Sequence, residues 1–413
     1  MQGDSTFRRI LHVATGAAIG QLLMIAASPV LTRLFSPADF GFFGVYLSIV
    51  SIIGSVSAFR YDVAGSVSKS QRLADLLFQL AVFCCFSVSA LVFFVALVGE
   101  SMEYALLCAL SVLFFGLFQA ATYVAVRSAK FKYVGLARAL QGGGGVLAQL
   151  CCGLVASDGL GLLVGFLVGL FLATLYLWNR LGLSFRLKTL FIFRLRYSFI
   201  AFKFQDFALK AMPATLIGTA GLFAPNILFT QFYGTSVAGS YVLAQRVVVL
   251  PMHFIGMAVA QVYLNKLASA YHERNIRFYS LVKTASLRLF LVGLFPTLFL
   301  CAFGQDVFGL VFGADWRLSG FYASILVWAF LLQLISSPLS NVFVVAGRQT
   351  LQLSWEIGRV CVVFVSIFFS SVFNMSSEFA VAMFSCVLAI SYLIQLWLIM
   401  RTAKACSLRF DGN

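Results

Sequence analysis

The chain has 413 residues, of which 61% are hydrophobic and only 10% are charged. A water-soluble domain carries roughly 45–50% apolar and about 25% charged residues, so this composition excludes a soluble globular protein and makes lipid the solvent for most of the chain. The net charge of +15 would by itself allow nucleic acid as a partner.

Long, solid apolar runs predict transmembrane helices, because the strands of a membrane barrel are short and alternate in hydrophobicity. A bilayer offers the backbone no water, so each span must satisfy its own hydrogen bonds as a helix. The first run follows two arginines, as in a signal peptide, but it is too long for one, and we expect it to be retained as a span. In chain order, twelve spans are predicted near residues 10–32, 39–63, 75–98, 103–126, 134–156, 160–179, 209–232, 237–262, 283–303, 320–346, 350–373 and 377–400.

Basic residues are concentrated in every second loop. One set of loops and termini carries Arg8, Arg9, Lys69, Arg72, Arg127, Lys130, Lys132, the basic residues between 180 and 203 and between 266 and 283, Arg348, Arg401, Lys404 and Arg409. The other set holds only Arg33 and Arg317, together with Asp39, Glu100, Glu103, Asp158, Asp306, Asp315 and Glu378. This positive-inside bias predicts that both termini are cytoplasmic. Contact with anionic lipid then explains the net charge, and nucleic acid is not expected as a partner.

The sequence gives no sign of a catalytic, metal or cofactor site. The nine cysteines lie outside the predicted outer loops, and their spacing resembles no zinc site. The three histidines are scattered, there is no P-loop, and the predicted outer loops are too short for a catalytic domain. We therefore expect no enzymatic activity, no metal and no cofactor.

A basic, aromatic segment divides the spans into two groups of six. The predicted organisation is a six-helix lobe over 1–180, a cytoplasmic linker over 181–208, which is either an interfacial helix or a plain basic loop, and a second six-helix lobe over 209–413. Residues 29–48 and 227–246 resemble each other weakly, by chance or as a true repeat. Two parallel halves around a central cleft would suit alternating access. The run Gly142–Gly145 indicates close helix approach or a soft hinge.

Arg246 is the clearest embedded charge. It lies nine residues into the span 237–262, and no acidic residue stands three or four positions away. An ionised side chain at the bilayer centre costs about 2.5–3.5 kcal/mol on insertion scales. The arginine therefore either lines a hydrated cleft and meets an anion, or pairs with an acid on another helix.

Four further charged candidates each have a structural alternative. Glu356 and Arg359 lie three residues apart on one helical face and can pair with each other. Arg60, followed by Asp62, lies near the inner end of its span, and it either snorkels as a topology anchor or lines the inner mouth of the cleft.

Lys210, near the inner end of span 209–232, has the same two interpretations, while Gln21, Gln261 and Asn226 either contact a ligand or bond neighbouring helices. Basic groups outnumber acids among the embedded residues, which predicts a cationic cleft suited to an anionic cargo, and arginine in particular suits phosphate oxygens. A cation-coupled pump would instead need a carboxylate that changes its protonation state. Glu356 and Asp62 are the candidates for that coupling role.

Residues 27–64, ASPVLTRLFSPADFGFFGVYLSIVSIIGSVSAFRYDVA, resemble the opening of Wzx-type polysaccharide flippases. The family pattern of Pro, Leu-Thr-Arg-Leu, an aromatic residue, Ser-Pro, acid-Phe-Gly and a later Arg-Tyr-acid is met by Pro29, Leu31–Leu34, Phe35, Ser36–Pro37, Asp39–Gly41 and Arg60–Asp62. Two further stretches, 203–216 and 241–263, also resemble the family, the second with Ala244–Arg246, Pro251 and Gln261 in place. Gly65 departs from the pattern, which has an aliphatic residue there.

The resemblance implies a member of the multidrug/oligosaccharidyl-lipid/polysaccharide exporter superfamily in the bacterial inner membrane. Such proteins move polyprenyl-pyrophosphate-linked sugar repeats to the outer leaflet for O-antigen (lipopolysaccharide), capsule or exopolysaccharide synthesis, and a polymerase and a chain-length regulator are then expected partners. Arg246, Arg60 and Arg359, with Gln261, Gln21 and Lys210, would contact the substrate. An ion-coupled multidrug antiporter of the same superfamily and a non-transporting scaffold for glycan assembly remain the alternatives.

Overall fold

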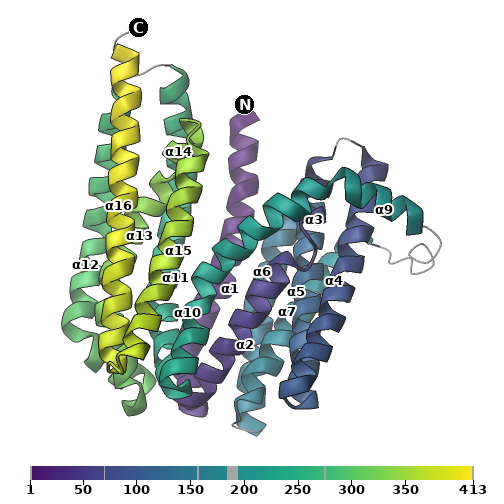
Figure 1. Ribbon diagram of the computed structural model, residues 1–413, viewed down its shortest axis with the longest axis vertical. Helices are drawn as coiled ribbons and strands as arrows, with labels where there is room; N and C mark the ends of the chain where they lie inside the picture. Colours follow the sequence, from purple (N-terminus) through teal and green to yellow (C-terminus); the bar gives the residue numbers. More distant parts are fainter. Residues whose placement is uncertain (1, 69, 156–157, 184–193, 274–275, 412–413) are drawn as a thin grey trace. The chain divides into compact units, whose positions relative to one another are not determined.

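The computed structural model describes residues 2–68, 70–155, 158–183, 194–273 and 276–411, and within these ranges it contains helices and no strands (Figure 1). The helices fall into two compact units, Met1–Ile227 and Leu228–Asn413.

The first unit contains α1 (Gln2–Leu34), α2 (Pro37–Val56), α3 (Tyr61–Val67), α4 (Gln71–Gly99), α5 (Met102–Arg127), α6 (Phe131–Val155), α7 (Leu160–Leu181), α9 (Arg194–Lys203), the π-helical turn η1 (Phe207–Ala211) and most of α10 (Met212–Tyr233). Helix α9 lies within the basic segment 181–208, and η1 runs from the end of that segment into the predicted span 209–232. The part of the segment from 184 to 193 lies outside the described residues.

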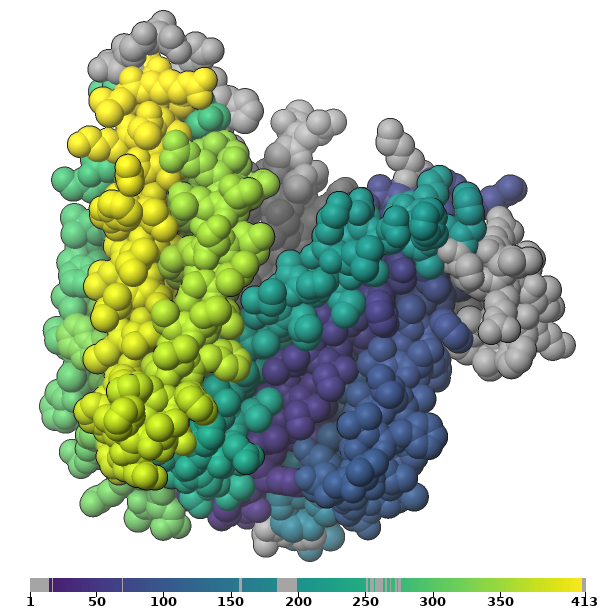
Figure 2. Space-filling view, in the orientation of Figure 1, coloured from purple at the N-terminus to yellow at the C-terminus, as the bar shows by residue number. Residues whose placement is uncertain are grey.

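The second unit contains the end of α10, α11 (Thr235–His272), α12 (Phe278–Phe312), the 3₁₀ turn η2 (Ala314–Trp316), α13 (Arg317–Leu339), α14 (Asn341–Val345), α15 (Gln349–Val372) and α16 (Ser377–Asp411). Helices α15 and α16 pack against each other, and Figure 2 shows them side by side along one face of this unit.

Nine helical segments of the described chain are long and apolar enough to cross a membrane. This confirms the prediction of an all-α polytopic membrane protein. Helices α1, α6 and α11 are not among the nine, although they occupy the predicted spans 10–32, 134–156 and 237–262. The count of twelve spans and the cytoplasmic position of both termini therefore stay predictions.

Helix α2 begins with a capping box, in which the side chains of Ser36 and Asp39 each accept a hydrogen bond from the backbone amide of the other residue. The Ser36 amide donates to the Asp39 carboxylate at 2.8 Å, and the Asp39 amide donates to the Ser36 hydroxyl at 3.3 Å. Pro37 stands at the first helical position, where a missing N–H has no cost. The Ser-Pro-x-acid stretch of the sequence is thus a helix start with a physical reason for each residue.

The predicted second span, 39–63, is interrupted. Helix α2 ends at Val56, and Phe59 and Arg60 adopt left-handed backbone conformations with φ of 49° and 61° before α3 begins at Tyr61. A left-handed conformation costs a residue with a Cβ roughly 1–2 kcal/mol. Such conformations persist where the surrounding structure enforces them, often at functional sites.

Helices α1, α6 and α7 approach one another through glycine. A Cβ atom added to Gly142 would lie 2.5 Å from the carbonyl oxygen of Gly20 on α1. On the other side of α6, a Cβ atom added to Gly169 of α7 would lie 2.9 Å from the Cα of Gly145. The glycine run at 142–145 therefore serves close helix approach, one of its two predicted roles.

Candidate functional site

Arg60 lies at the break between α2 and α3 in the first unit. Its Nη2 donates to the hydroxyl of Tyr123 on α5 at 3.4 Å, and its guanidinium lies 5.8 Å from the centroid of the same ring. Its Nε is buried without a hydrogen-bond partner in the described chain, and no described carboxylate is within ion-pair distance of it. The guanidinium therefore keeps donor capacity for a further acceptor.

A second arginine, Arg138 on α6, also lies against an aromatic ring of α5. Its guanidinium is 5.8 Å from the centroid of the Phe118 ring, and it is close enough to Tyr123 for an electrostatic interaction. The described residues provide it with no ion-pair partner either. The candidates chosen from the sequence did not include Arg138. Its position four residues inside the predicted span 134–156 was the signal that could have identified it.

Asp62 is buried in the first turn of α3, with 4% of its surface exposed. One carboxyl oxygen accepts the Val63 amide at 2.9 Å, and the other, Oδ2, has no hydrogen-bond partner among the described residues. The carboxyl lines a cavity of about 40 Å³ between α3, α4 and α5. Arg127 of α5 lines the same cavity and donates to the carbonyls of Gly65, Ser66 and Ser68, so it holds the C-terminal end of α3.

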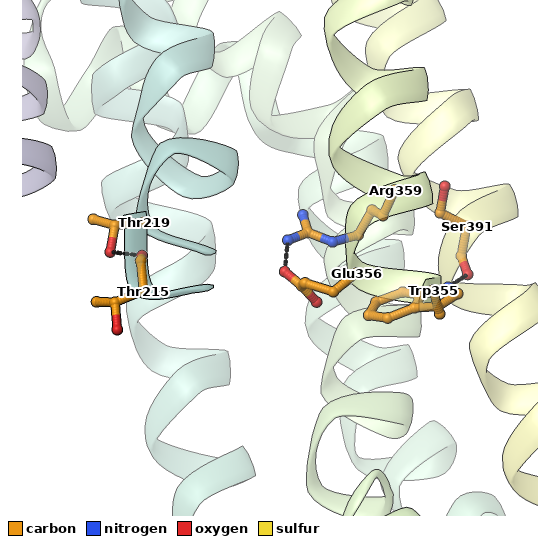
Figure 3. Close-up of polar contacts among 6 residues, drawn as sticks. All are labelled: Thr215, Thr219, Trp355, Glu356, Arg359 and Ser391. Carbon is orange, nitrogen blue, oxygen red and sulfur yellow. Dashed lines mark hydrogen bonds and ion pairs between the residues drawn. The ribbon is translucent and has the colours of Figure 1, made fainter. Parts of the chain in front are cut away.

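The second unit carries a separate polar cluster on α15. Arg359, which is 6% exposed, donates from Nη2 to the Glu356 carboxylate and stacks over the Trp355 ring at 5.6 Å (Figure 3). The Trp355 Nε1 donates to the Ser391 carbonyl of α16 at 2.9 Å. The charge of Arg359 is thus balanced on its own helix, the arrangement that the three-residue spacing allows.

The remaining predicted residues belong to other elements of the two units. Arg246 lies on α11, is half-buried, and has an interaction partner within the protein. Lys210 forms an exposed ion pair with Asp206 at 2.9 Å. Gln21 has a buried Oε1 without a partner in the described chain, and the side chain of Gln261 lies outside the described residues.

Asn226 donates from Nδ2 to the Ser48 hydroxyl at 3.1 Å and so links α10 to α2. Of the predicted residues, the first unit brings together Arg60 and Asp62. Guanidinium groups of the kind that Arg60 and Arg138 present offer forked donors to phosphate or carboxylate oxygens. No group of three or more potential metal ligands occurs among the described residues. The chemistry that this part of the molecule supports is therefore anion binding.

Solved structures with a similar fold include transporters and a flippase. An inward-facing multidrug-resistance transporter of the MATE family and MOP superfamily matches with a TM-score of 0.72 at 15% identity, over 96% of this chain and 98% of that chain. The lipid II flippase MurJ, in an inward closed conformation, matches with a TM-score of 0.73 at 14% identity, over 97% and 90%. A MOP superfamily transporter from Pyrococcus furiosus, whose binding pocket is described as having reverse polarity, matches with a TM-score of 0.59 at 14% identity, over 98% and 96%.

At these identities the structural likeness establishes the fold. A comparison of the sequence with curated proteins finds no match. A family model described as polysaccharide biosynthesis protein matches residues 30–320. That range contains the Ser36 capping box, the break that carries Arg60, the Arg138 helix and Arg246. The chain therefore belongs to the polysaccharide biosynthesis protein family, on a fold similar to that of MOP superfamily transporters and flippases.

Proposed function

We propose that this protein is a flippase that moves polyprenyl-pyrophosphate-linked oligosaccharide repeat units from the inner to the outer leaflet of the bacterial cytoplasmic membrane. The family match to polysaccharide biosynthesis proteins and the fold likeness to a lipid II flippase support this assignment. The translocated repeat units would be used for the synthesis of O-antigen, capsule or exopolysaccharide. A polymerase and a chain-length regulator would act with the flippase in that synthesis.

The observation that carries the proposal is the pair of arginines, Arg60 and Arg138, held against aromatic rings of α5 without a carboxylate partner in the described chain. Ring stacking supports an arginine without neutralising its charge. A pyrophosphate is the matching ligand, since it carries several oxygens for forked donors and more than one negative charge. Arg246 is proposed as the corresponding cation of the second unit, with Gln21, Gln261, Lys210 and Arg359 as further contacts.

The proposed mechanism is alternating access. The lobes 1–180 and 209–413, joined by the segment 181–208, would expose a cationic cleft first to one leaflet and then to the other, while the lipid tail stays in the bilayer. A bound ligand can drive such a change only if its affinity differs between the two states. The arginines would provide this difference in affinity by contacting the pyrophosphate in one state and losing that contact in the other.

The test is transport of a polyprenyl-pyrophosphate-linked oligosaccharide in proteoliposomes. Arg60→Ala and Arg138→Ala should each lower the rate about tenfold or more, because a hydrogen bond to a charged group contributes about 1.5–3 kcal/mol. Arg60→Lys should retain part of the rate, and Arg72→Ala, at an exposed position of α4, is the control. Wild-type rates in both alanine variants would refute the site, and absence of transport by the wild type would favour a scaffold.

A second candidate is an ion-coupled antiporter for small molecules. The buried carboxyl of Asp62 and the half-buried Glu356 favour it, since cation coupling requires a carboxylate. The test is export of cationic dyes from the same proteoliposomes, driven by a proton or sodium gradient. Export by the wild type that is lost in Asp62→Asn would favour the antiporter over the flippase.

A further inference from the structure

The Asp62 carboxyl lies where an ionised group is poorly accommodated. It is 4% exposed, and its Oδ2 has no hydrogen-bond partner in the described chain. Burying a carboxylate without full compensation costs several kcal/mol, and such groups become neutral by binding a proton. The adjoining cavity of about 40 Å³ exceeds the roughly 10–15 Å³ that one water needs, so water can carry a proton to the carboxyl.

The charges around Asp62 act in opposite directions. Burial raises the pKa of the Asp62 carboxyl above its ordinary value, and the positive charge of Arg60 lowers it in part, as does the hydrogen bond from the Val63 amide. Arg60 and Tyr61 stand at the start of α3 itself. The charged and titratable groups on the elements packed against it are Arg72, Asp75, Cys84 and Cys85 on α4, Glu103, Tyr104, Cys108, Tyr123 and Arg127 on α5, and Lys210 on η1.

Arg60 and Asp62 are held in a fixed relation to each other. Arg60 is the residue before α3, in the left-handed conformation, and Asp62 is in the first turn of the same helix. Arg127 holds the other end of α3 through the Gly65, Ser66 and Ser68 carbonyls. The backbone positions from which the two side chains extend are therefore fixed by this short helix, and the charge of Arg60 acts on the Asp62 carboxyl.

We propose that Asp62 is a proton-binding site whose occupancy is linked to anion binding at Arg60. An ionised Asp62 offsets the positive charge of Arg60 and weakens its attraction for an anion, whereas a protonated Asp62 leaves that charge available. An anion on Arg60 in turn removes the field that favours ionised Asp62, and so strengthens proton binding. Linkage makes the two effects equal in size. Proton and anion therefore bind together at this end of the first unit.

The proton-binding part is tested without ligand, by thermal unfolding of the purified protein in detergent between pH 5 and pH 8. A raised folded-state pKa means that the folded protein holds the proton more tightly than the unfolded chain. Wild-type stability therefore falls as pH rises from the ordinary carboxyl pKa, about 3.9, through the pKa of folded Asp62. Asp62→Asn should gain stability relative to the wild type as pH rises, and Asp75→Asn, at an exposed position on the rim of the same cavity, should follow the wild type.

A second variant covers the case in which Asp62→Asn does not fold. Arg60→Gln removes the positive charge that favours ionisation, so the loss of stability should shift to higher pH. An Asp62→Asn profile parallel to that of the wild type, or an Arg60→Gln profile without an upward shift, would overturn proton binding at Asp62.

The linkage part rests on the proposed function, and its probe is farnesyl pyrophosphate, titrated calorimetrically at pH 6 and pH 8. The wild type should lose at least about five-fold more affinity between these pH values than Asp62→Asn does, which is the lower end of typical coupling between sites. The ionisation of the probe is common to both proteins and cancels in that ratio.

The outcomes separate the two proposals. Equal pH dependence in wild type and Asp62→Asn, with binding that Arg60→Gln weakens, overturns the linkage and leaves the anion site in place. Binding that Arg60→Gln does not weaken, or no binding at all, overturns the anion site and the linkage with it, while the ligand-free profiles still decide whether Asp62 binds a proton.

Discussion

Gly142→Ala tests the packing of α1 against α6. The added Cβ would lie 2.5 Å from the carbonyl oxygen of Gly20 and 2.6 Å from its Cα and carbonyl carbon. Each of these atoms belongs to the backbone of α1, so no side-chain rotation can relieve the contact. The two helices must move apart along a seam where Gly16 also approaches the backbone of Gly135.

The magnitude follows from the size of that displacement. Restoring ordinary contacts of 3.4–4 Å requires the helices to separate by about 1 Å, and a gap of 0.5–1 Å already forfeits a quarter to a half of each dispersion contact. Overpacking a well-packed site costs about 1–3 kcal/mol. Alanine recovers up to about 1 kcal/mol in helix propensity. We expect a net loss of about 1–2 kcal/mol in the free energy of unfolding.

The assay is thermal unfolding in detergent, with Gly218→Ala as the matched control. Gly218 lies within α10 and has nothing within 4 Å of its added Cβ, so only the propensity gain remains. The two variants should therefore shift the melting temperature in opposite directions, downward for Gly142→Ala and upward for Gly218→Ala. A melting temperature for Gly142→Ala at or above the wild-type value would refute the close approach of the two backbones.

Three further predictions concern single contacts. Ser36→Ala removes the capping box with Asp39 and should destabilise the protein by about 1 kcal/mol in chemical or thermal unfolding, whereas Ser36→Thr should cost only a fraction of that amount. Glu356→Gln leaves the buried Arg359 without its counter-charge and should cost about 2–3 kcal/mol, near the lower end of the values for breaking a buried pair, because Glu356 is partly exposed. The double variant Glu356→Gln/Arg359→Met should recover most of this loss, and strictly additive effects in the double-mutant cycle would contradict the pair. Phe59 has φ of 49°, so Phe59→Gly should be about 1 kcal/mol more stable than Phe59→Ala, because both variants lose the ring and only glycine relieves the left-handed strain; equal thermal stability of the two variants would contradict the strain.

The membrane class and the approximate positions of the helices were predictable because they depend on local composition. A run of about 20 apolar residues specifies a spanning helix whatever it packs against. The glycine run at 142–145 indicated close approach for a similarly local reason, since only glycine lets a backbone come so near. The start of α2 was also present in the sequence, as Ser36, Pro37 and Asp39 stand at capping-box spacing.

The break between α2 and α3 was not predictable. Phe59 and Arg60 have no intrinsic preference for the left-handed region, and Ser57, just before them, packs closely against Cys85 of α4 and Gly116 of α5. A local pattern cannot report a conformation that is enforced from outside the segment. The continuous apolar stretch 39–63 therefore indicated one unbroken helix.

The sequence by itself determined that this chain is a polytopic helical membrane protein with an excess of embedded arginines, because hydropathy and charge are sums over neighbouring residues. Only the tertiary structure decided which charges are already balanced. Arg359 has Glu356 on its own helix, and Lys210 has Asp206, whereas Arg60 and Arg138 face aromatic rings of α5. The two ion pairs are local, and their spacing in the sequence allows them. For Arg60 and Arg138, the distance to any counter-charge and the surrounding dielectric are set by residues outside their own helices, so no local pattern reports them.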